Sequence, residues 1–134
     1  MIMASMEKCI VFLSSIYIVD DDQSFGKSLR RLLNARGFSA HHYGSAQSFL
    51  DSVPPSQEGY AVVDIHMPEC DGFGLIDKMR ALHYNTRVIV ITGRASDDVM
   101  DLALQKGALG LLQKPFSEES LLELLNKTEH QAAL

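Results

Sequence analysis

Three aspartates, a threonine and a lysine are the residues of this 134-residue chain that could do chemistry, and each follows a short apolar run. They are Asp20, Asp21, Asp64, Thr92 and Lys114. Three neighbouring carboxylates repel one another unless a divalent cation is present, and hard oxygen ligands with room for water favour Mg²⁺. A carboxylate can attack phosphorus once the charge of the phosphoryl group is neutralised, and a lysine and a threonine hydroxyl can assist there. The set therefore predicts a phosphoryl-transfer site.

The apolar runs that precede these residues have the composition of buried parallel strands. They are rich in aliphatic and β-branched residues, and helical patterns lie between them. The runs are Ile16–Val19, Tyr60–Val63, Val88–Ile91 and Leu109–Leu112. Such alternation predicts one α/β domain with an open parallel sheet, in which ligands bind outside the carboxyl ends of the strands. All five polar residues are thus predicted to reach the same edge of the sheet.

Local signals predict where the helices begin and end. Helix starts are expected at Ser45, Ser96 and Ser117, and helix ends near Ser52, Gly37 and Gly107. We expect Gly72 and Gly74 to precede the third helix, and a second strand over Phe38–Tyr43. The adjacent residues His41 and His42 lie on that strand and must point to opposite faces, so they cannot form a metal pair.

The chain divides into residues 1–14, an N-terminal extension, residues 15–128, one domain, and residues 129–134, a tail or the start of a linker. A net charge of -5 and a pI near 5.4 argue against nucleic-acid binding through this segment. No run approaches the roughly 20 apolar residues of a membrane span. Cys9 and Cys70 have no CxxC spacing and are expected to be free thiols, which suits a reducing, cytoplasmic location.

Several segments together resemble the receiver domain of bacterial two-component response regulators. They are Val19-Asp20-Asp21-Asp22, Asp64-Ile65-His66-Met67-Pro68, Asp71-Gly72, Ile91-Thr92-Gly93, Gly107-Ala108 and Lys114-Pro115-Phe116. Ser45-Ala46, Phe49-Leu50 and the segment around Thr92 are most similar to FixJ-like transcription regulators, which carry a LuxR-type DNA-binding output domain.

This resemblance implies a flavodoxin-like (βα)5 fold with strand order 2-1-3-4-5 and helices on both faces. It makes Asp64 the phosphoacceptor, and it makes Thr92 and Lys114 the residues that hold the phosphoryl oxygens. It also implies that Asp21 and Asp64 bind Mg²⁺ directly, that Asp20 does so through water, and that the backbone carbonyl of His66 completes the protein ligands. A cis peptide bond is expected between Lys114 and Pro115.

The resemblance further implies a signalling switch rather than an enzyme, with a sensor histidine kinase as phosphodonor and DNA reached through an output domain absent from this chain. Alternatives are a stand-alone receiver, a binding module that works without phosphorylation, and a phosphatase with an aspartate nucleophile. The phosphatase alternative requires a threonine after the first-strand aspartates, but in this chain Gln23 follows Asp20-Asp21-Asp22.

One position departs from the family pattern. Receivers usually carry an aromatic switch residue three positions before the lysine, and here that position is Leu111. His66 and Arg94 lie two positions after Asp64 and Thr92 and could tune the lifetime of the acyl phosphate. We expect Met100 and Leu104 to face outward beside Leu111, with Val99, Leu102 and Ala103 forming the other apolar stripe, and to form a homodimer contact that phosphorylation strengthens.

Overall fold

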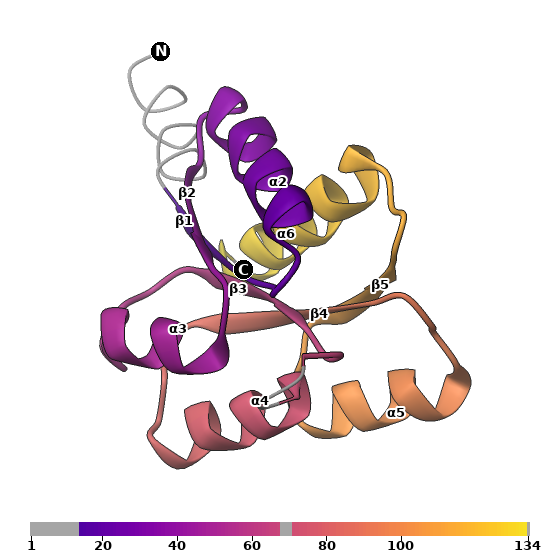
Figure 1. Cartoon of the computed structure of the whole chain (residues 1–134). Coiled ribbons are helices and arrows are strands. Elements are labelled where there is room, and N and C mark those ends of the chain that lie inside the picture. The colour runs from indigo at the N-terminus through magenta and orange to yellow at the C-terminus, as the bar shows by residue number, and fades with distance from the viewer. Residues whose placement is uncertain (1–13, 68–70, 134) are drawn as a thin grey trace.

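A computed structural model describes residues 14–67 and 71–133 of the chain (Figure 1). The predicted extension, apart from Ser14, and Cys70 lie outside the described residues. Strands and helices alternate along the whole described chain. The elements are β1 (Ser15–Val19), α2 (Gln23–Ala35), β2 (Ser39–Tyr43), α3 (Ala46–Ser52), β3 (Tyr60–Asp64), α4 (Gly72–Ala81), β4 (Arg87–Thr92), α5 (Asp97–Gln105), β5 (Gly110–Gln113) and α6 (Glu118–Ala133).

The strands form one parallel five-stranded sheet in the order β2-β1-β3-β4-β5. Val19 pairs with Val63, and Asp64 pairs with Ile91, so the carboxyl ends of the central strands lie level with one another. The chain crosses from β2 past β1 to β3, so the direction of strand addition reverses beside β1, and the edge at that reversal is where ligands bind in open α/β sheets. The predicted fold class and strand order are confirmed.

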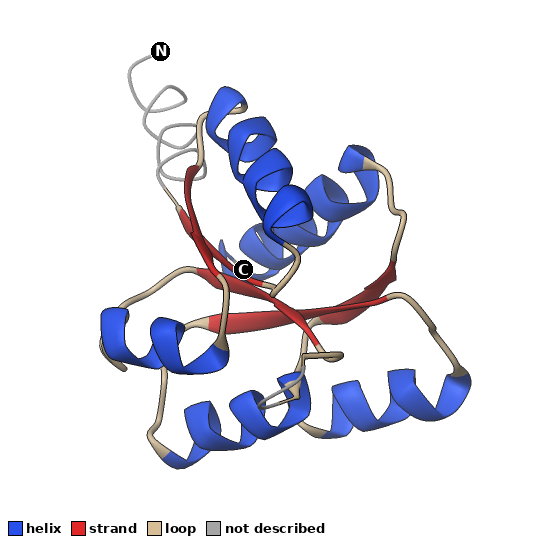
Figure 2. Cartoon of the chain, in the orientation of Figure 1, coloured by secondary structure: helices blue, strands red, loops and turns tan. Residues whose placement is uncertain are grey.

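Helices cover both faces of the sheet (Figures 1 and 2). On one face, α2 and α6 pack on a cluster that includes Ile18, Leu33 and Leu121, all fully buried. On the other face, α3, α4 and α5 pack on a cluster that contains Phe49 and Leu75. Alternate residues of the buried central strands supply these two layers, which is why the strands read as continuous apolar runs.

The predicted helix caps are present. Ser45 and Ser96 accept hydrogen bonds from backbone amides in the first turns of α3 and α5, and α3 ends at Ser52 as expected. Gly37 and Gly107 follow α2 and α5 with φ of 97° and 91°, a left-handed conformation that ends helices at little cost for glycine. Ser117 accepts from the amide of Ser120 at 3.1 Å, as a residue before a helix does.

Other predicted boundaries were wrong. Gly72 and Gly74 do not precede α4 but lie in its first turn, because Asp71 caps the helix by accepting from the Gly74 amide at 2.7 Å. The last helix continues to Ala133, through residues that were predicted to be a tail or the start of a linker. Residues 126–133 lack the apolar spacing that marked the earlier turns, yet most of them are good helix formers.

Candidate functional site

Three aspartates meet at the carboxyl edge of the sheet. Asp20 and Asp21 follow β1, and Asp64 ends the neighbouring strand β3. One carboxylate oxygen from each lies within 4.8 Å of the others. Asp20 and Asp64 are buried whereas Asp21 is exposed, so the cluster has a closed inner side and an open outer side.

Asp20 is held by several contacts. Its Oδ1 accepts from the Asp22 amide at 2.9 Å, and its Oδ2 accepts from Lys114 Nζ at 2.6 Å. Burial raises the pKa of Asp20, as does the nearby charge of Asp64, while the hydrogen bonds from Lys114 and Asp22 lower that pKa in part. The loss of hydration on burial outweighs the stabilisation of the charged form by its hydrogen-bond partners, so the pKa of the Asp20 carboxyl lies above its ordinary value.

Lys114 lies between two of the carboxylates. Its Nζ is 2.6 Å from Asp20 Oδ2 and 3.5 Å from Asp64 Oδ2. Burial lowers the pKa of Lys114, but the hydrogen bond and charge of Asp20 and the charge of Asp64 outweigh that effect and raise it. The peptide bond from Lys114 to Pro115 is cis, which confirms the prediction. The ammonium group also lies 4.2 Å from the ring centroid of Phe25, a cation–π contact from α2.

The hydroxyl of Thr92, the last residue of β4, is buried and engaged by neighbours. His66 Nε2 lies 2.9 Å from Thr92 Oγ1. The same oxygen accepts from the Arg94 amide at 3.0 Å and lies within donating distance, 3.2 Å, of the Arg94 carbonyl. The two residues predicted as tuning candidates thus both contact the threonine, Arg94 through its backbone and His66 through its ring.

A cavity of about 470 Å³ opens over Asp64. It is lined by Asp64, His66, Gly93, Arg94 and Lys114. Oδ1 of Asp64 accepts from the His66 amide at 2.9 Å, which leaves the carboxylate fixed at the base of the cavity. The start of α4 passes close to the end of β3, because a Cβ on Gly72 would lie 2.7 Å from the Asp64 carbonyl oxygen. The five predicted residues are therefore brought to one edge.

The surface beside this edge is formed by α5 and β5. Leu111 is half-buried in β5, and Val99 packs with it against the core, as does the fully buried Ala103. Leu104 faces outward with half its surface exposed, as predicted, while Met100 is half-buried. Leu102 was expected on the inward stripe and is instead 39% exposed, because Ala103 occupies the position nearest the sheet.

Two contacts of the site were not predicted from the sequence. Nε2 of His42 lies 2.8 Å from the backbone carbonyl oxygen of Asp20, and the ring of Phe25 lies beside Lys114. His41, by contrast, stacks on Tyr17 on the other face, so the two histidines point apart as expected. Adjacency on a strand indicated which faces the histidines occupy but not which backbone atoms they reach.

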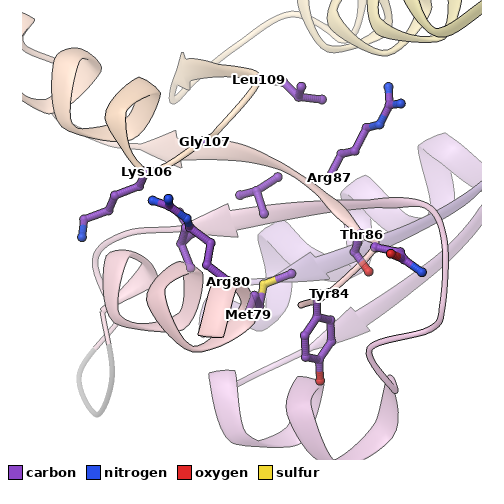
Figure 3. Close-up of a pocket in the computed structure, with 11 residues that line it drawn as sticks. Met79, Arg80, Tyr84, Thr86, Arg87, Lys106, Gly107 and Leu109 are labelled. Carbon is purple, nitrogen blue, oxygen red and sulfur yellow. The ribbon is translucent and has the colours of Figure 1, made fainter. Parts of the chain in front are cut away.

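A second pocket, of about 330 Å³, lies at the opposite edge of the sheet, near the start of β4 and the ends of α4 and α5 (Figure 3). Lys106 Nζ bonds both carboxylate oxygens of Asp77 at 2.8 and 3.0 Å, and Arg80 donates to the Gln105 carbonyl at 3.5 Å. These contacts tie α4 to α5. None of Asp20, Asp21 and Asp64 lines this pocket, and we interpret it as a gap left where α4 and α5 pack together.

The carboxylates fit a hard divalent cation. Their oxygens converge, and the exposed side of Asp21 leaves room for the waters that Mg²⁺ retains. The crowding of Asp20 by Asp64, which contributes to its raised pKa, is the repulsion that a cation would relieve. The ligand role of the His66 carbonyl and the water-mediated role of Asp20 remain predictions.

The fold and this edge define a flavodoxin-like domain with an aspartate-centred site. The family model for the response regulator receiver domain matches residues 16–126. The chain belongs to this family.

The relatives are response regulators. FixJ of Bradyrhizobium diazoefficiens, a transcriptional regulatory protein, is 33% identical over 117 residues, which are 87% of this chain and 57% of that protein. The response regulator protein TodT of Pseudomonas putida is 34% identical over 109 residues, 81% of this chain and 48% of that protein. The crystal structure of FixJ-N has a TM-score of 0.79 and 31% identity, covering 87% of this chain and 94% of that one. The chain thus spans a little over half the length of FixJ.

Within the described residues, none of the helices combines the length and apolar character needed to cross a bilayer.

Proposed function

We propose that this domain is a phosphorylation-operated switch, and that Asp64 accepts the phosphoryl group. The observation that carries the proposal is the position of Lys114, whose ammonium group lies between Asp20 and Asp64 at the base of an open cavity. A lysine at this position can move its ammonium group from Asp20 to an oxygen of the incoming phosphoryl group, so that its positive charge stays paired with a negative one. Family membership supports the same assignment.

The reaction is a transfer from a phosphohistidine. An oxygen of the Asp64 carboxylate attacks phosphorus, a P–O bond forms, and the P–N bond to the donor imidazole breaks, so that its electron pair returns to the donor nitrogen. The product is an acyl phosphate on Asp64. Lys114 pairs with the phosphoryl charge and the Thr92 hydroxyl donates to a phosphoryl oxygen, so the protein mostly positions groups and supplies charge.

Mg²⁺ is the proposed cofactor, held by Asp21 and Asp64 directly, by Asp20 through water and by the His66 carbonyl. When bound, it neutralises negative charge on the carboxylates and the phosphoryl oxygens. Asp20 remains paired with Lys114 until the phosphoryl group arrives, which keeps the inner side of the cluster compensated.

The proposed phosphodonor is a sensor histidine kinase, and the proposed place of action is the cytoplasm. The surface of α5, β5 and α6 would change with the position of Thr92, with Leu111 following it inward. Because relatives such as FixJ are transcriptional regulators, we propose that the signal passes to a DNA-binding output region of a longer protein. A stand-alone receiver is the alternative.

A small phosphodonor such as acetyl phosphate tests the assignment. With Mg²⁺, intact-mass spectrometry should show one phosphoryl group on the wild type and none on Asp64→Asn, which keeps the shape but removes the nucleophile. Asp71→Asn is the matched control, because asparagine also caps helices and Asp71 is exposed. It should be phosphorylated as the wild type is.

Equal phosphorylation of the wild type and Asp64→Asn would reject the proposal. A wild type that takes no phosphoryl group would favour the phosphorylation-independent binding module. Release of many phosphates per chain, rather than a single burst, would favour the phosphatase alternative.

A further inference from the structure

His42 connects the second strand to the acidic cluster. It lies near the end of β2, opposite Ile18 of β1 in the parallel register, and its ring reaches past the end of β1. Nε2 of His42 lies 2.8 Å from the carbonyl oxygen of Asp20. A carbonyl can only accept, so Nε2 carries the proton and donates.

The Asp20 backbone is consequently held at both of its polar atoms. Its amide donates to the Tyr43 carbonyl at 3.0 Å, and its carbonyl accepts from His42. The carbonyl of Asp20 belongs to the peptide plane that joins Asp20 to Asp21. Since peptide units are planar, fixing that oxygen fixes the direction in which the chain leaves for Asp21.

The ring of His42 packs against α2 at Gly26, in the space that a side chain at this position would fill. A Cβ on Gly26 would overlap the imidazole, with Nε2, Cδ2 and Cε1 as its nearest atoms. Gly26 is buried near the start of α2, as its fourth residue, where alanine is a better helix former than glycine. The missing side chain at this position is explained by the close approach of the ring.

We propose that His42 is a positioning residue for the cation site, acting through the Asp20–Asp21 peptide. It touches neither the cation nor the phosphoryl group. Its hydrogen bond orients the peptide so that the exposed carboxylate of Asp21 converges with those of Asp20 and Asp64. This inference rests on the proposed function, because it concerns how the Mg²⁺ site of that switch is assembled.

Two substitutions separate the hydrogen bond from the volume of the ring. His42→Leu fills the space without a hydrogen-bond donor. In His42→Gln the side-chain amide nitrogen is separated from Cα by the same number of covalent bonds as Nε2 of histidine, so it can donate in its place. Loss of one hydrogen bond should weaken Mg²⁺ binding about threefold to tenfold in His42→Leu. His42→Gln should stay within about twofold of the wild type.

Two further variants are matched to these. Gly26→Ala should displace the ring and reproduce the loss in His42→Leu, although alanine favours the helix. His41→Leu is the control, because His41 is the same residue type on the opposite face and bonds Ser39 rather than Asp20. It should leave Mg²⁺ affinity unchanged.

The measurements are titration calorimetry with Mg²⁺ alone and phosphorylation by acetyl phosphate at several Mg²⁺ concentrations. A positioning role predicts that His42→Leu needs more Mg²⁺ but reaches the wild-type rate at saturation. A general loss of structure would lower the maximal rate instead. In metal-free protein, nitrogen NMR should find the proton of His42 on Nε2.

The inference is overturned if folded His42→Leu keeps wild-type affinity, or if His42→Gln is as weak as His42→Leu. Should His42→Leu not fold, Gly26→Ala decides, and unchanged affinity there overturns it. A wild type that neither binds Mg²⁺ nor accepts phosphate defeats the proposed function itself. That outcome is separate, because it is measured without any substitution at His42.

Discussion

Replacing His66 with alanine should make the domain easier to activate. In the structure the His66 ring holds Thr92 Oγ1 at 2.9 Å, and the hydroxyl is also bonded to the Arg94 backbone. A threonine that is to donate to a phosphoryl group on Asp64 must give up part of this arrangement. The contact with His66 therefore stabilises the state without phosphate relative to the phosphorylated state.

The size of the effect follows from one hydrogen bond. A net contribution of about 0.5–1.5 kcal/mol is typical, and His66 is exposed, so water competes for its ring and the lower half of that range applies. A change of about 0.5–1 kcal/mol corresponds to roughly twofold to fivefold in an equilibrium constant. A ligand of the active state should gain up to that factor in affinity, since its apparent affinity scales with the population it binds.

Beryllofluoride, a mimic of the acyl phosphate, provides the assay. Its affinity with Mg²⁺ can be measured from amide NMR shifts in the wild type, His66→Ala and His66→Gln, and only the alanine variant should bind more tightly. The same substitution in a Thr92→Ala background should give no gain, because the hydroxyl that His66 holds is then missing.

Two results would refute the reasoning. Unchanged or weaker beryllofluoride binding in His66→Ala would mean that the ring does not oppose activation. An equal gain in the Thr92→Ala background would mean that His66 acts on the site by another route.

Two further predictions concern charge and association. Burial raises the pKa of Asp20, so the folded state binds that proton more tightly than the unfolded chain, and metal-free stability should fall as pH rises above the ordinary value of 3.8. Asp20→Asn removes this dependence. Urea unfolding at several pH values should show that the free energy of unfolding of Asp20→Asn, relative to that of the wild type, increases with pH. A difference that does not change with pH would contradict the assignment. Activated protein should form homodimers through the surface around Leu104, and Leu104→Ser should weaken them more than tenfold if each copy loses about 1 kcal/mol of burial. Sedimentation with beryllofluoride checks this, with Leu82→Ser as the control at another exposed leucine; a monomeric wild type at high concentration, or equal effects of the two variants, would reject the surface.

The fold was predictable because its signals are local and consistent. The buried central strands read as continuous apolar runs, and polar caps or glycines mark most helix ends, so these signals predicted the parallel sheet, while its strand order came from the resemblance to receiver domains. The third helix was misplaced because glycine usually lies outside helices, whereas Gly72 is required where α4 passes the Asp64 carbonyl. The length of α6 was missed because the apolar period stops before the helix does.

Much of the site was predictable for the same reason, since strand ends in a parallel sheet share an edge. The contacts between side chains were not. That His42 reaches the Asp20 carbonyl, 22 positions away, depends on the β1–β2 register and on the space left by Gly26. That Phe25 lies beside Lys114 depends on how α2 packs against the sheet and on Phe116, which contacts the Phe25 ring. Neither contact can be predicted from the spacing of residue types along the sequence.

Residues from both edge strands or directly after them contact the same buried residue, Asp20. Asp20 follows the inner strand β1, yet His42 of β2 contacts its backbone carbonyl. Lys114, which directly follows β5 and lies 94 positions along the chain, contacts its carboxylate. Edge strands have one neighbouring strand each, so fewer contacts oppose their local opening. Fraying at either side of the molecule is therefore felt at a single buried residue. During synthesis, the acids of β1 and β3 are made before their lysine, so the charge of the site is balanced only when the last strand docks.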